Sequence, residues 1–267
     1  MTVDYFISQH SLAATVNYTR TCLTTSTTKN SIQPLESAIA GTAWSVMAQF
    51  YKLLPRIPRQ EHPALLLGMG YNFEFYDGMF ALIAGYVQMS MDEGDYTPRY
   101  RAMQALLQPF CSEYGIEPSR PIMKSHRQLY AEFYRSVAGE PLPERYPQDK
   151  ANPWLNVSRQ WTERMAQTLA CPQGSSLDRA KFNLGYHWAV EYLSIEEFRL
   201  MRQAWGKLGI KASYLDAHCK VEEEHARRAS EAVLALASPD DATIARAIKT
   251  HENDLTGYYR NLSGLLK

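Results

Sequence analysis

Apolar residues recur at helical spacing along almost the whole chain, and no sustained alternation of β-branched residues is bounded by tight turns. The pattern therefore predicts an all-α protein. With 267 residues, we expect one helical domain over residues 1–267. The helices expected from apolar spacing and terminal signals span residues 4–25, 33–54, 62–91, 97–114, 120–138, 153–170, 176–208, 211–237 and 240–265.

Two segments stand out from this pattern. Residues 139–154 contain four prolines, which forbid a continuous helix, so we expect a long loop that serves either as a lid or as a connector. Residues 64–89 are long and apolar enough to span a bilayer. Their two carboxylates, Glu74 and Asp77, lie near the middle. Burying two charged groups there in a lone membrane-spanning helix would cost much free energy. We therefore expect a helix in the protein core and no membrane partner.

Charge and cysteine content narrow the function classes. Lysine plus arginine equals aspartate plus glutamate at 28 each, so no net field attracts nucleic acid or an anionic surface. The four cysteines form no C-x-x-C pair, and no signal segment opens the sequence. These features predict a cytoplasmic protein with no nucleic-acid partner.

The stretch YLDAHCKVEEEHARRA, residues 214–229, places His218, Glu222 and His225 at intervals of four and three. At about 100° per residue these side chains share one narrow helical stripe with Leu215 and Ala229, so they point toward the core. The neighbours Glu223 and Glu224 fall on the opposite, solvated face. Buried imidazoles and carboxylates need partners, which either a metal or a hydrogen-bond network supplies.

Other predicted helices also place acids on apolar stripes. Glu36 shares a face with Met47 and Phe50 if 33–54 is one helix, and Glu74 and Asp77 lie in a segment without a wide polar face. Glu191 lies on an apolar stripe with His187 one turn before it, whereas Glu196 and Glu197 are expected to point away. This inventory is too rich in carboxylates for one zinc ion and is typical of two iron or manganese ions in a helical bundle.

These residues resemble the haem-oxygenase-like diiron oxidases and oxygenases, which are related in fold to thiaminase II and PQQ synthase C. The motif His-x3-Glu-x2-His and the preceding single Glu191 carry the resemblance. It implies a haem-oxygenase-like bundle that binds two Fe(II) ions, with manganese as an alternative, and uses O2. The ligand and catalytic residues implied are Glu36, Glu74, Glu191, His218, Glu222 and His225. No histidine follows Glu74 closely, so either Asp77 or His187 completes the set, or one metal site is weaker.

The resemblance also implies the chemistry: oxidation of a small amino-acid-like or fatty-acid-like substrate by desaturation, N-oxygenation, ring closure or C–C cleavage, in natural-product biosynthesis. An external electron donor and a homodimer are further expectations. Arg202 is a candidate clamp for a substrate carboxylate, although surface pairing is the commoner role of such an arginine. Candidate aromatic residues at the site are Tyr71, Tyr76 and Tyr186, for which core packing is the alternative.

Two other functions remain open. One is a metal-free enzyme of the thiaminase or PQQ-synthase type, with His218, His225 and Glu191 as acid–base groups. A thiaminase-type reaction needs a cysteine nucleophile, and Cys219 lies about 100° from the histidine stripe. The other is a non-catalytic helical binding protein, in which the buried polar groups only fix the packing.

Overall fold

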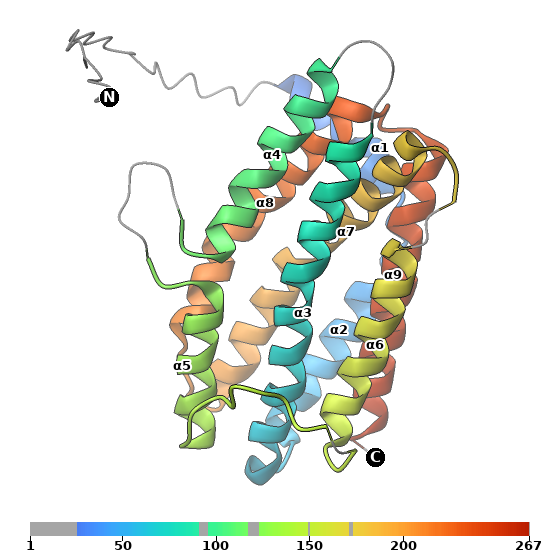
Figure 1. Cartoon of the computed structure of the whole chain (residues 1–267). Coiled ribbons are helices and arrows are strands. Elements are labelled where there is room, and N and C mark those ends of the chain that lie inside the picture. Colours follow the sequence, from blue (N-terminus) through green and yellow to red (C-terminus); the bar gives the residue numbers. More distant parts are fainter. Residues whose placement is uncertain (1–25, 91–95, 117–122, 149, 171–172, 267) are drawn as a thin grey trace, which may run out of the picture.

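The computed structural model describes residues 26–90, 96–116, 123–148, 150–170 and 173–266. Within these ranges the only regular secondary structure is helical (Figure 1). They are α1 (Ser26–Ser37), α2 (Thr42–Leu53), η1 (Leu54–Arg56), η2 (Arg59–Glu61), α3 (His62–Met89), α4 (Thr97–Glu113), α5 (His126–Ala138), α6 (Pro153–Ala170), α7 (Ser176–Lys207), α8 (Ser213–Leu236) and α9 (Ala242–Gly264). The all-α prediction is confirmed, and the predicted helix 4–25 lies outside the described residues.

The prediction of one continuous helix over residues 33–54 is wrong. The chain breaks between α1 and α2, where Gly41 adopts a φ of 82°, a conformation that favours glycine. The carboxylate of Glu252 on α9 accepts hydrogen bonds from the backbone N–H groups of Ala40 at 2.7 Å and Thr42 at 2.9 Å. A buried acid from another helix therefore caps the start of α2, which no local pattern around residue 40 indicates.

Helix α7 is the centre of the bundle. It packs against α2, α3, α8 and α9, and it is buried on all sides over residues 182–189, whereas Arg199, Arg202 and Gln203 near its end are exposed. In Figure 1, α4, α5 and α8 form the left side, α6 and α9 the right side, and α3 crosses the front. Close approach of α7 and α9 depends on Gly185, where a Cβ atom would lie 2.9 Å from the backbone oxygen of Ile244.

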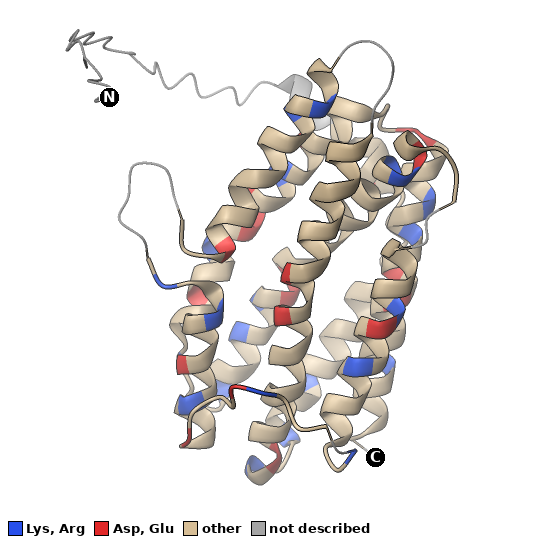
Figure 2. Cartoon of the chain, viewed as in Figure 1, with Lys and Arg blue, Asp and Glu red and all other residues tan. Residues whose placement is uncertain are grey.

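Helix α3 packs inside this bundle against α4, α5, α6 and α7, as expected for residues 64–89. Figure 2 shows that its acidic residues are confined to the middle of the helix. None of the helices in the described ranges combines the length and the hydropathy that crossing a bilayer requires.

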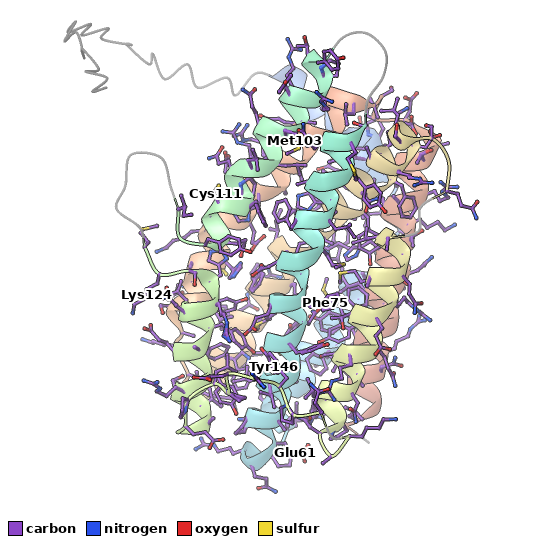
Figure 3. The ribbon with its side chains drawn as sticks, in the orientation of Figure 1. Glu61, Phe75, Met103, Cys111, Lys124 and Tyr146 are labelled. Carbon is purple, nitrogen blue, oxygen red and sulfur yellow. The ribbon has the colours of Figure 1, made fainter. Side chains whose placement is uncertain are left out.

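The proline-rich segment 139–152 joins α5 to α6 and is tied to α3. Figure 3 shows Tyr146 lying across α3. Its hydroxyl donates a 2.8 Å hydrogen bond to Glu74, and its ring meets that of Tyr71 edge-on with centroids 5.1 Å apart. Tyr146 thus ties this segment to α3.

Replacing Glu252 by alanine is expected to lower the free energy of unfolding by about 2–3 kcal/mol, because the N–H groups of Ala40 and Thr42 lose a charged acceptor. Urea denaturation followed by circular dichroism measures the change. The exposed Glu223→Ala serves as a control and should shift stability by less than about 0.5 kcal/mol. Equal effects of the two substitutions would show that the cap contributes nothing.

Candidate metal centre

The polar stripe of α8 is buried as predicted. His218, Glu222 and His225 expose 5%, 4% and 4% of their surface, whereas Glu223 is exposed. Glu224 pairs with the surface residue Arg227. The division of the three consecutive glutamates into one inward and two outward is therefore confirmed.

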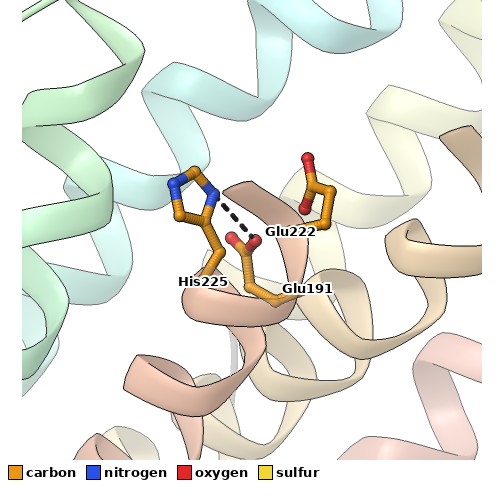
Figure 4. A group of neighbouring side chains, drawn as sticks. All are labelled: Glu191, Glu222 and His225. Carbon is orange, nitrogen blue, oxygen red and sulfur yellow. Dashed lines mark ion pairs between the residues drawn. The ribbon is translucent and has the colours of Figure 1, made fainter. Parts of the chain in front are cut away.

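Glu191 of α7 meets this stripe, and Figure 4 shows it beside Glu222 and His225. The Nδ1 atom of His225 lies 3.6 Å from Glu191 Oε2. Glu191, Glu222 and His225 each offer one donor atom, and these atoms lie within 4.8 Å of one another. Two carboxylates and an imidazole at this spacing can share a metal ion.

Two further residues of the site were missed from the sequence. Glu113 ends α4 and lies 3.9 Å from His225 Nδ1, and His126 begins α5 with its Nδ1 against Glu113. The His126 ring also approaches that of His218, with centroids 4.3 Å apart. Helical arithmetic places Glu113 on the buried face of Leu106, so that signal was available for the acid. His126 lies on the apolar stripe of Tyr130 and Phe133 in α5, so the same signal was available for the imidazole.

Of the two acids on α3, Asp77 is the one placed toward this group. Glu113 and His126 are its strongest charged neighbours, and both Asp77 and Glu113 line the same cavity. Glu74 lines this cavity too, but Arg127 pairs with its carboxylate at 3.1 Å and Tyr146 donates to it. The structure thus favours Asp77 over Glu74 as the α3 donor.

His187 remains beside the cluster. Its Nδ1 lies 2.6 Å from the Tyr76 hydroxyl and 3.5 Å from Glu191 Oε1, and its ring packs on Phe80 at 4.4 Å. These contacts suit a residue that orients Glu191.

Several other predicted site residues are not brought to the cluster. Glu36 was placed there by the continuous helix 33–54; with that helix broken, it lies on α1 and accepts a 3.2 Å hydrogen bond from Tyr192. Arg202 is largely exposed and pairs with Asp216 at 2.7 Å, so it takes the surface role and does not line the cavity.

Of the three candidate tyrosines, only Tyr76 lines the cavity. Tyr71 packs against Phe75 and Tyr146. Tyr186 directs its hydroxyl at Asp254, 3.4 Å away. Core packing therefore accounts for Tyr71 and Tyr186.

The cavity beside the cluster has a volume of about 100 Å³. Its walls carry the donors together with aromatic side chains from α3, α5, α7 and α8, namely Phe73, Tyr76, Phe80, Tyr130, Phe198 and Tyr214. Glu197 also lines it and is only 7% exposed, so the expectation that Glu197 points away is wrong. Glu197 lies one turn from Leu193 and one turn from Met201, both fully buried, so the buried face of α7 is wider than the Glu191 stripe.

The electrostatics of the cluster show a deficit of positive charge. Burial, followed by the carboxylates of Glu191 and Glu113, raises the pKa of Glu222 well above its usual range. Burial and the cluster histidines His126 and His225 hold the pKa of His218 well below its usual range. Glu191 is the exception: burial raises its pKa, but His225 and His187 outweigh this and lower it.

The donor atoms fit a metal. The Nε2 atom of His218 is buried and has no hydrogen-bond partner among the described residues, while its Nδ1 lies 2.5 Å from Glu222. An ionised Glu222 accepts the Nδ1–H and leaves the Nε2 lone pair free for a cation. A bound cation would also lower the raised pKa values of the neighbouring acids.

Comparison with known proteins agrees with this arrangement. Residues 72–252 match the model of a family described as iron-containing redox enzymes, a range that contains every residue of the cluster. The structure resembles that of a CADD-like protein of unknown function from Nostoc punctiforme PCC 73102, with a TM-score of 0.65 and 15% identity over 89% of this chain and 96% of the other. No curated protein matches the sequence. The predicted haem-oxygenase-like bundle is confirmed.

Asp77 makes the stability of the metal-free protein depend on pH. Burial and the Glu113 carboxylate raise its pKa from 3.8 to about 7. Between these values the folded protein holds a proton that the unfolded chain has released, so this contribution to stability is lost as pH rises toward 7. Urea denaturation with a chelator should therefore show Asp77→Asn gaining stability relative to the native protein from about pH 4 to pH 7. A constant offset over that range would contradict the assignment.

Proposed function

Because the chain belongs to the family of iron-containing redox enzymes, we propose that it is a non-haem diiron enzyme that uses O2 to oxidise a small organic substrate. The observation that carries the proposal is the convergence of four carboxylates and three imidazoles from five helices. They are Asp77, Glu113, Glu191, Glu222, His126, His218 and His225. Four carboxylates balance the charge of two divalent ions, and such a mixed oxygen and nitrogen set suits iron or manganese.

Alternative metals and cofactors fit these donors less well. A structural zinc site takes four nitrogen or sulfur donors and rarely several carboxylates. A haem takes one or two axial ligands and has no use for four clustered acids. The donor set therefore favours two non-haem ions.

When bound, two iron ions would supply the positive charge that the carboxylates lack and the electrons that activate O2. Residues of the chain hold the donors in place. Glu222 fixes the tautomer of His218, and the Phe198 ring stacks on that imidazole with centroids 3.9 Å apart. Tyr76 holds His187 beside Glu191. The aromatic walls of the cavity exclude water and bind the apolar part of a substrate.

The surroundings of Cys219 disfavour it as the nucleophile of a thiaminase-type reaction. Cys219 is half-buried and does not line the cavity, and burial raises the pKa of its thiol. A thiol in that state is a poor nucleophile. The substrate in this proposal is amino-acid-like or fatty-acid-like, and an external donor provides any electrons that substrate oxidation does not.

Anaerobic loading with Fe(II) is expected to give about two irons per chain, because seven donors are enough for two ions. Exposure to O2 should then change the optical spectrum as the iron is oxidised. His225→Ala should lower iron uptake, since His225 lies between Glu191 and Glu113. Native protein that takes up no iron, or a variant with native uptake, would overturn the diiron assignment.

We propose Glu113 as a metal ligand, whereas the sequence led us to expect Glu74. Glu113→Gln should weaken Fe(II) or Mn(II) binding by at least about tenfold, a loss at the lower end of that seen for residues supporting metal ligands. Glu74→Gln is the matched control on α3 and should bind metal nearly as the native protein does, because Arg127 and Tyr146 already engage Glu74. Anaerobic titration measures both, and the reverse order would reinstate Glu74 as the ligand.

A further inference from the structure

Glu197 is a buried acid of the cavity that the metal centre does not use. It lies six residues after Glu191 on α7, a rise of about 9 Å along the helix axis. Its side chain lines the same cavity as the metal donors. The acid is thus a polar group of the cavity separate from the metal donors.

Two tyrosines support Glu197 from outside the cavity. Tyr259 of α9 donates its hydroxyl proton to Glu197 Oε1, and Tyr51 of α2 lies 2.8 Å from the Tyr259 oxygen. Since Tyr259 has only one hydroxyl proton, Tyr51 must be the donor in the second hydrogen bond. Both hydroxyl dipoles therefore point toward the carboxylate, an arrangement that stabilises its anionic form.

No positive charge balances this carboxylate among the described residues. Its Oε2 atom makes no hydrogen bond there, and no lysine, arginine or histidine forms an ion pair with it. Burial raises the pKa of Glu197 to about 7, against the lowering effect of the Tyr259 hydrogen bond. An ionised carboxylate in such surroundings is costly unless a cation joins it.

The aromatic walls of the cavity also suit a cation. Phe73, Tyr130, Phe198 and Tyr214 line the cavity and contact one another, with Tyr130 and Tyr214 centroids 4.9 Å apart. Aromatic faces attract ammonium groups. The cavity's arginine, Arg127, is already paired with Glu74, so the cavity has no free guanidinium for a carboxylate tail.

We propose that Glu197 binds the ammonium group of a primary-amine substrate whose carbon chain extends toward the metal donors. The proposal rests on the function proposed above and narrows its substrate class. Glu197 binds an amine and repels the carboxylate of a fatty acid. The rise of about 9 Å between Glu197 and Glu191 puts the oxidised carbon several bonds from the nitrogen.

The test measures binding and not turnover. Butylamine, hexylamine and octylamine are titrated against the alcohols and carboxylates of the same length, with Trp161 in the cavity wall as a fluorescent reporter alongside calorimetry. At about pH 8.5 Glu197 is ionised and the alkylammonium remains protonated. Amines should bind at least about tenfold more tightly than the matching alcohols, and carboxylates more weakly than either.

Glu197→Gln should lower amine affinity at least about tenfold and leave alcohol affinity nearly unchanged, because the amide keeps the shape and loses the charge. Glu196→Gln is the matched control: its neighbour Arg199 pairs with it at the surface, and amine binding should stay native. Tyr259→Phe keeps the acid, so amines should still bind ahead of alcohols, which covers the case in which Glu197→Gln fails to fold. Native protein without amine preference, or Glu197→Gln with native amine affinity, would overturn the proposal.

Each titration is run on metal-free and on Mn(II)-loaded protein. Amine preference that persists without metal supports Glu197 even if iron loading fails. Stoichiometric iron uptake without amine preference removes only the role of Glu197. The two proposals can therefore fail independently.

Discussion

Burial of acidic groups in the middle of a helical bundle is the constraint on which this structure depends. Glu191 and Glu222 sit out of water beside Asp77 and Glu113, and no lysine or arginine enters their cluster in the described ranges. Left alone, such acids shift toward their neutral forms, as the raised pKa values of Glu222 and Asp77 show. A pair of divalent cations would reverse that shift, and this links the packing to the proposed chemistry.

The scaffold provides the rigidity that such a cluster needs. Helix α7 carries Glu191 through the centre of the bundle, and contacts with α2, α3, α8 and α9 hold it in place. The close contact at Gly185 and the cap that Glu252 places on α2 join α9 to the other helices. Stiff helices hold donor atoms at fixed separations more accurately than loops would, so the stability of the bundle and the geometry of the site have the same origin.

The two proposals place the metal and the ammonium group of the substrate at different turns of α7. One end of the cavity gathers the metal donors around Glu191, while Glu197 lies farther along α7 among aromatic rings. The CADD-like protein shares this fold at only 15% identity, and a fold does not by itself fix the chemistry of a protein. The chemistry depends on individual side chains such as Glu197. Differences among such proteins at the position of Glu197 would change which substrate is held without changing the metal site.

The sequence alone determined the all-α fold and the inward stripe of His218, Glu222 and His225, together with Glu191, because helical periodicity is a local property of continuous helices. Tertiary packing decided the rest. It broke the helix after α1 and so left Glu36 away from the donors, brought Glu113 to them, and widened the buried face of α7 to include Glu197. The choice of Asp77 over Glu74 also depended on partners from other helices and from the connecting segment. Helical arithmetic assumes one straight helix with one buried face, and these residues depend on contacts between segments far apart in the chain.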